Sequence, residues 1–222
     1  MKLTSLALLA TLSLPAFAAP ALSPLAEFAK CDASFYRLLG SNPELLKNAN
    51  LVSKDGMANF KLGPMEDQTE GMKELTKGME EFARDVEFQP PVLFPEGIGA
   101  DYYSERHFRS TRSFTSHENG KEELYRWKLN LLASPKQVRS ALDKAGKLPW
   151  QCEDGICTVF RQQQNAGWAI VGQGKVDGNK PYLVLMLSED ATDKKKSELE
   201  CELRTEGRFL PKDTLKSLRP NW

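Results

Sequence analysis

The chain has 222 residues, with 30 basic and 30 acidic side chains and a formal net charge of +0. Hydrophobic residues make up 41% and charged residues 27%, an ordinary globular composition that excludes disorder along the whole chain. A neutral chain has no long-range attraction for phosphate groups, so we expect no nucleic-acid partner.

The first 18 residues have the features of a secretory signal peptide. A positive Lys2 precedes an apolar run over residues 3–14, and Ala16-Phe17-Ala18 matches the small-residue rule for cleavage. The apolar run is shorter than a helix needs to cross about 30 Å of hydrocarbon. We therefore expect cleavage after Ala18, a mature protein in a bacterial periplasm and no transmembrane segment in the mature chain. The alternative is an uncleaved N-terminal anchor.

All four cysteines lie after this segment, and an even number in an oxidising compartment favours disulfides. Cys152 and Cys157 flank an Asp-Gly turn dipeptide, which brings their Cβ atoms close enough for a bond. By elimination Cys31 pairs with Cys201, and both lie on apolar faces of the expected elements. The alternative for this second pair is two separate buried thiols that act as small hydrophobic side chains.

The N-terminal part opens with helix signals. Ser23-Pro24 predicts a helix start, because Ser caps helices and Pro is favoured at the first helical position. Apolar side chains continue at helical spacing to Leu39, and Gly40 is expected to end the helix. Lys54-Asp55-Gly56 then predicts the turn of a small hairpin.

A second helix is expected over residues 71–85. Apolar side chains from Met72 to Val86 recur at alternating spacings of three and four, which is typical of one helix face. Gly71 and Gly78 each disfavour that helix by about 1 kcal/mol relative to Ala.

The proline- and glycine-rich stretch over residues 89–99 is the candidate domain boundary. It separates an N-terminal helical and hairpin part, 19–95, from a C-terminal part, 96–222. Whether the two parts form one compact domain stays open at this point.

The C-terminal part predicts a sheet. Residues 121–132 alternate apolar with polar side chains as a half-buried strand does, and Ser134-Pro135 and Gly146 delimit a helix. Further elements are expected as strands at 158–162, 168–174, 182–188 and 198–205 and a helix at 211–218. Short spacers favour antiparallel neighbours. The fold class is therefore α+β, with an antiparallel sheet of about five strands in the C-terminal half, packed with N-terminal helices and one intervening helix.

The usual catalytic signatures are missing: the sequence has no nucleophile elbow, phosphate-binding loop or paired-histidine zinc motif. It has only two histidines, His107 and His117, and neither has a second ligand at helical or hairpin spacing. We expect no metal site and no cofactor.

The segment 101–112 is the candidate binding site. It has an arginine at every third position and aromatic residues between them, and the expected binding residues are Tyr102, Tyr103, Arg106, Arg109 and Arg112. Arginine binds carboxylates and phosphates bidentately, and exposed Tyr and Arg are favoured at interfaces. The segment therefore predicts a surface for an acidic protein or an anionic ligand. In the alternative interpretation these arginines pair with the chain's own acids.

A second charged surface is expected on the strand over residues 198–205. Glu198, Glu200 and Glu202 alternate with apolar residues, so they share one face. Such charges protect an edge strand from pairing with another chain, and they also suit a basic partner.

These observations favour a secreted periplasmic protein without catalytic activity, a binding or interaction protein of the inhibitor or immunity type. The alternative is a periplasmic hydrolase that acts on an envelope polymer through paired carboxylates, for which the chain has many acidic candidates.

Overall fold

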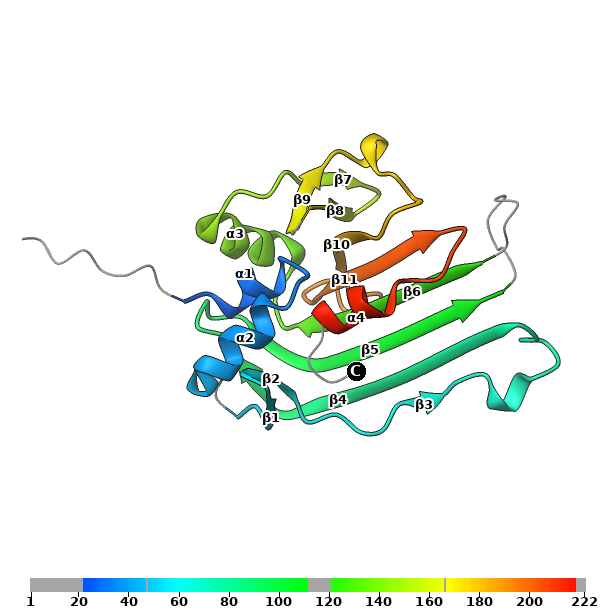
Figure 1. Ribbon diagram of the computed structural model, residues 1–222. Helices are drawn as coiled ribbons and strands as arrows, with labels where there is room; N and C mark the ends of the chain where they lie inside the picture. The colour runs from blue at the N-terminus through cyan, green and yellow to red at the C-terminus, as the bar shows by residue number, and fades with distance from the viewer. Residues whose placement is uncertain (1–21, 47, 112–120, 166, 219–222) are drawn as a thin grey trace, which may run out of the picture.

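A computed structural model describes residues 22–46, 48–111, 121–165 and 167–218 (Figure 1). The predicted signal peptide, 1–18, lies outside the described residues, as do Arg112 and His117. The described part has an α+β fold built on a large antiparallel sheet.

The α-helices are α1 (Pro24–Phe28), α2 (Ser34–Ser41), α3 (Pro135–Ala145) and α4 (Lys212–Leu218). The 3-10 turns are η1 (Pro43–Leu45), η2 (Glu70–Met72) and η3 (Gln173–Lys175). The strands are β1 (Leu51–Lys54), β2 (Met57–Phe60), β3 (Glu66–Asp67), β4 (Met79–Leu93), β5 (Gly99–Ser110), β6 (Glu122–Leu131), β7 (Gln151–Glu153), β8 (Ile156–Gln164), β9 (Gly167–Val171), β10 (Tyr182–Glu189) and β11 (Ser197–Glu206).

The main sheet has nine strands in the order β3-β4-β5-β6-β11-β10-β8-β7, with β9 also paired to β8. All of its neighbours are antiparallel. The expected sheet of about five strands was too small, because β3, β4 and β5 extend it on one side and β7 on the other. The expected strands of the C-terminal half are confirmed as β6, β8, β9, β10 and β11.

The helix expected over residues 71–85 is wrong. The chain forms the short turn η2 there and then enters β4, which pairs with β5 along most of its length. Phe82 and Val86 are four residues apart, and this spacing fits one face of a strand as well as one face of a helix. Met72 and Leu75, which completed the helical pattern, are exposed.

The proline- and glycine-rich stretch is divided between β4, which contains Pro90 and Pro91, the turn that follows, which contains Pro95, and the start of β5 at Gly99. The register of β4 against β5 shifts between Glu87 and Val92, so the prolines of β4 lie where the strand pairing is irregular. The expected boundary between 95 and 96 falls in the turn from β4 to β5. One hydrophobic cluster contains residues from both sides of it, from Leu25 to Leu218.

The first helix expected from the sequence is two helices. α1 and α2 are separated at Cys31, whose φ of 58° is outside the helical region. Gly40 does not end the helix, because it lies inside α2. A Cβ atom on Gly40 would lie 2.3 Å from the backbone oxygen of Gly56, so the glycine lets α2 approach the β1–β2 turn. That hairpin is confirmed, with Asp55 and Gly56 both at positive φ.

Both disulfide pairings are confirmed. Cys31, in the loop between α1 and α2, is bonded to Cys201 in β11, and the Cα atoms are 5.4 Å apart. Cys152 and Cys157 are directly opposite each other in the β7–β8 hairpin, with Cα atoms 4.0 Å apart.

The helices gather on one face of the sheet, and the position of Cys201 shows which face it is (Figure 1). Because Cys201 is bonded to the α1–α2 loop, the odd-numbered side chains of β11 face the helices and the even-numbered ones face away. The helix-side face carries the largest buried side chains of the strands, including Trp127, Tyr103 and Tyr125.

Candidate functional site

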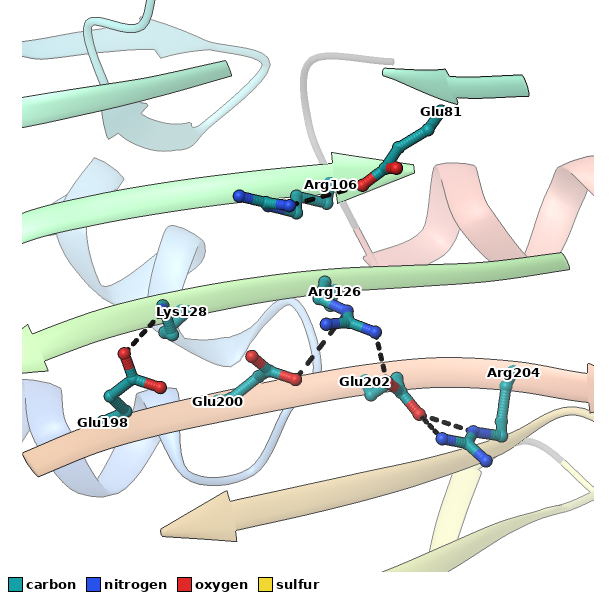
Figure 2. A network of polar contacts seen from close by, with 8 residues as sticks. All are labelled: Glu81, Arg106, Arg126, Lys128, Glu198, Glu200, Glu202 and Arg204. Atoms are coloured by element: carbon teal, nitrogen blue, oxygen red, sulfur yellow. Dashed lines mark hydrogen bonds and ion pairs between the residues drawn. The ribbon is translucent and has the colours of Figure 1, made fainter. Parts of the chain in front are cut away.

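The opposite face of the sheet carries the chain's most extensive described network of charged side chains (Figure 2). We call this side of β4, β5, β6, β10 and β11 the open face. Its ion pairs are Lys128–Glu198 (2.6 Å), Arg126–Glu202 (3.5 Å), Arg126–Glu200 (3.8 Å), Arg106–Glu81 (3.3 Å) and Arg204–Glu202.

Strand register explains why these charges meet. Glu200 is directly opposite Lys128, and Glu202 is directly opposite Arg126. Cross-strand neighbours of opposite charge stabilise a sheet by a few tenths of a kcal/mol, up to about 1. The expectation that the glutamates of β11 protect an edge is wrong, because β11 lies in the middle of the sheet between β6 and β10.

Two of these carboxylates are largely removed from water although no described helix packs on this face. The side chain of Glu202 is 2% exposed and that of Glu200 is 15% exposed, and both are paired with Arg126 of the neighbouring strand. Burial raises the pKa of Glu200, opposed by Arg126 and reinforced by Glu202. The charged form of Glu200 is therefore incompletely stabilised by its own neighbours.

The open face is acidic in sum. Its acidic residues are Glu81, Asp85, Glu87, Glu122, Glu198, Glu200, Glu202 and Glu206, and its basic residues are Arg106, Arg126, Lys128 and Arg204. Eight acids against four bases give this face a negative potential, although the whole chain is neutral.

The structure separates the residues of the expected arginine patch. Tyr102 and Arg106 lie on the open face, whereas Tyr103 and Arg109 point to the helix side. Side chains alternate along a strand with a period of two, so residues three apart lie on opposite faces. Tyr103 is fully buried and is no part of any surface.

The two described arginines of this segment, Arg106 and Arg109, have partners within the chain. Arg106 pairs with Glu81, as in the alternative that the sequence left open. The guanidinium of Arg109 lies over the ring of Phe209, 3.8 Å from its centroid.

The interpretation of the sequence missed the buried polar cluster around Glu105. Its carboxylate is completely buried and accepts hydrogen bonds from Tyr103 and Tyr125, each at 2.7 Å, and from Asn59 at 3.1 Å. Arg84 completes the cluster, with its Nη2 atom 2.6 Å from Glu105 Oε2. A usable signal was the alternation of Tyr103, Glu105 and His107 on one strand face.

His107 lies in β5 with its side chain 18% exposed, and its Nε2 atom is 2.7 Å from Glu123 Oε1. The other oxygen of Glu123 accepts a hydrogen bond from the backbone of Leu210, so this pair anchors the segment before α4. Within the described ranges, no group of three or more His, Cys, Asp or Glu residues could hold a metal ion.

Arg161 is a second buried charge, on the helix side of β8. Arg161 is 6% exposed, and its Nη1 atom has no hydrogen-bond partner. Burial lowers the pKa of Arg161, and the nearby charge of Asp32 opposes this. Arg161 lines none of the three cavities described next.

Cavities open at the surface of the described part of the chain, and three of them are lined by charged side chains. One of about 680 Å³ lies beside α3 and Cys157, one of about 750 Å³ lies between α1 and α3, and one of about 330 Å³ lies at the β7–β8 hairpin. The second contains two carboxylates, but Glu27 pairs with Lys30 at 2.7 Å and Glu96 accepts a hydrogen bond from the backbone of Leu25 at 3.1 Å. Glu96 therefore fixes the start of α1 through one oxygen, whereas its other oxygen, Oε2, is buried without a hydrogen-bond partner, and Glu27 makes only a local ion pair.

In the described part of the chain, no helix is long and apolar enough to cross a membrane. Comparisons with protein-family models, with curated proteins and with solved structures found no match to this chain.

Proposed function

We propose that this protein is a secreted, non-catalytic binding protein of the periplasm, of the inhibitor or immunity type, and that it binds a basic partner on the open face. The observation that carries the proposal is a broad sheet face with eight acids against four bases, held in order by ion pairs. The two disulfides are compatible with an extracellular or periplasmic location.

A basic partner fits the structure better than the acidic partner expected from the sequence. The acidic partner required three arginines on one surface, whereas Arg106 is paired with Glu81 and Arg109 lies on the other side of the sheet. A cationic group near Glu200 would supply the stabilisation that its own neighbours leave incomplete. Ordered charges also give an interface specificity and a fast, salt-dependent association.

Binding is preferred to polymer hydrolysis because of where the carboxylates lie. A glycosidase places two carboxyl groups on either side of the bond that it cleaves. Glu200, whose pKa is raised, lies on the open face and lines none of the three cavities described above. In the cavity of about 750 Å³, Glu27 pairs with Lys30 and one oxygen of Glu96 is engaged by the backbone of Leu25. The hydrolase remains the alternative that the experiment must test.

The test is capture of partners from envelope extract with the oxidised protein, followed by calorimetric titration of the captured partner. We expect Glu198→Gln and Glu200→Gln each to weaken binding at least fivefold, about 1 kcal/mol, and added salt to weaken binding to the unaltered protein. The matched control is Glu44→Gln, because Glu44 is an exposed carboxylate in η1, away from the open face.

Two outcomes contradict the proposal. One is a partner whose affinity is insensitive to salt and to both open-face variants. The other is release of soluble fragments from an envelope polymer incubated with the protein, which would establish the hydrolase instead.

A further inference from the structure

The two disulfides differ sharply in their surroundings. Cys31 and Cys201 are both completely buried, under the α1–α2 loop. Cys152 is exposed and Cys157 is half-buried, in a hairpin at the end of the sheet. A thiol in solution can therefore reach the second bond without unfolding the core.

An arginine from another element contacts the exposed sulfur. Arg139 of α3 points its Nη1 atom at Cys152 Sγ, 3.4 Å away. A guanidinium at this distance stabilises a thiolate relative to a thiol. If the disulfide is opened, Cys152 is thus the better leaving group of the two sulfurs, because better-stabilised thiolates leave faster.

The cavity next to the Cys152–Cys157 disulfide gives a thiol access to the other sulfur atom, that of Cys157. The cavity of about 680 Å³ is lined by Cys157 together with three basic side chains, Lys136, Arg139 and Lys144, and one acidic side chain, Asp143. Cys152 instead lines the smaller cavity, next to Glu153 and Asp154. The charges of the two cavities therefore direct an anionic thiol to Cys157 and away from Cys152.

We propose that Cys152–Cys157 is a thiol–disulfide exchange site for a small anionic thiol, one that carries carboxylates. The thiolate of this co-reactant attacks Cys157 Sγ, a new sulfur–sulfur bond forms there, and the Cys152–Cys157 bond breaks. The electron pair of the broken bond leaves on Cys152 Sγ, beside Arg139.

A second molecule of the same thiol completes the reaction. Its thiolate attacks the thiol's sulfur in the mixed disulfide and releases Cys157 as a thiolate. The sum is oxidation of two thiols to one disulfide and two-electron reduction of Cys152 and Cys157, which take up the two thiol protons. Oxidation of the protein by the disulfide form of the thiol is the same sequence in reverse.

The first experiment follows reduction of the full oxidised chain by dithiothreitol, which is uncharged as a thiol. Samples are quenched by alkylation, and peptide mass spectrometry identifies the opened bond. We expect Cys152–Cys157 to open at least a hundredfold faster than Cys31–Cys201, which also reports that the core stays folded. Arg139→Gln should slow this opening about fivefold, while Arg139→Lys, which keeps the positive charge, should slow it less than twofold.

The second experiment tests the choice of thiol by comparing glutathione, which is anionic, with cysteamine, which is cationic. We expect Lys136→Gln to lower the ratio of the glutathione rate to the cysteamine rate about threefold, and to lower the dithiothreitol rate less than the glutathione rate because the dithiothreitol thiolate carries a single negative charge. The matched control is Lys54→Gln, because Lys54 is an exposed lysine in the β1–β2 hairpin, away from the cavity.

Equal opening rates for the two disulfides, or an unchanged rate in Arg139→Gln, would overturn the exchange site. A glutathione preference that is absent, or that is the same in Lys136→Gln, would overturn the assignment of an anionic thiol. Neither experiment depends on the open face, so the proposed binding function stands or fails separately.

Discussion

Glu105 is a charged side chain that the fold takes completely out of water. Each of its oxygens accepts hydrogen bonds, Oε1 from Asn59 and Tyr103 and Oε2 from Tyr125 and Arg84. Burial is the largest single effect on the pKa of Arg84 and lowers it, but the charge and the hydrogen bond of Glu105, together with Tyr125 and Tyr103, outweigh burial and the pKa is raised. Arg84 therefore keeps its positive charge beside the buried carboxyl group of Glu105.

Replacement of Arg84 should lower the free energy of unfolding far more than replacement of an arginine on the open face. We expect Arg84→Met to lower the free energy of unfolding by about 3–5 kcal/mol, because Glu105 then stays buried without its counter-charge. The control Arg106→Met removes an exposed pair and should lower it by less than about 1 kcal/mol. Urea denaturation measures both, and equal effects would contradict the structural role of Glu105.

Buried tyrosines make the protein sensitive to alkali. Burial, reinforced by the charge of Glu105, raises the pKa of Tyr103 and Tyr125 well above 10, and burial raises that of Tyr102 and Tyr182 to about 12. Below about pH 10 these tyrosines are protonated in both the folded and the unfolded state, so they do not make the free energy of unfolding depend on pH. Above it the unfolded chain loses the protons first, so the free energy of unfolding falls as pH rises toward 12.

For each of the fully buried Tyr103 and Tyr125 the decline is at most about 1.4 kcal/mol per pH unit. Denaturation curves at pH 9, 10 and 11 should show it, and Tyr125→Phe should make the decline shallower. A free energy of unfolding that stays constant up to pH 11 would show that these tyrosines ionise normally.

At the scale of elements, the sequence predicted the structure correctly wherever a local residue pattern is compatible with only one kind of element. Ser134 and Gly146 bound α3 as predicted, and Asp-Gly turns placed both the β1–β2 and the β7–β8 hairpins. The helix over 71–85 failed because a spacing of four residues is shared by helices and strands. Arg106 and Arg109 are divided between the two faces of the sheet because residues three apart share a face in a helix but not in a strand.

Strand order was beyond the reach of the sequence. Alternation in β11 gave the correct division between its two faces, but it cannot tell a central strand from an edge strand. The ion pairs of the open face depend on β6 lying next to β11, although about 70 residues separate Lys128 from Glu198 along the chain. Such a site requires the tertiary fold before it can be recognised.

The contact between α2 and the β1–β2 turn gives a prediction for Gly40. We expect Gly40→Ala to lower the free energy of unfolding by about 1–3 kcal/mol, because the new Cβ meets the backbone of Gly56 at 2.3 Å. This exceeds the gain of up to about 1 kcal/mol from the higher helix propensity of Ala. The control is Gly146→Ala, which has open space around it and should be nearly neutral. Thermal denaturation distinguishes the two, and a stabilised Gly40→Ala protein would contradict this packing.

At the scale of the whole molecule, the two disulfides should contribute unequally to stability. Chain entropy predicts about 5 kcal/mol for a bond that closes a separation of 170 residues and about 2 kcal/mol for one that closes a separation of five. We expect Cys31→Ala with Cys201→Ala to be much less stable than Cys152→Ala with Cys157→Ala. Guanidinium denaturation checks this, and the reverse order of stability would contradict it.

The central place of β11 also has a consequence for how the protein is made. β6 and β10 both pair with β11, so neither has all its neighbours until the ribosome has added residues 197–206. Cys201, which is bonded to Cys31, lies in the same strand, so the Cys31–Cys201 disulfide can form only after residues 197–206 have been added. A nascent chain of this design stays open through most of its synthesis, which is compatible with the secretion that we propose, because export through a channel requires an unfolded chain.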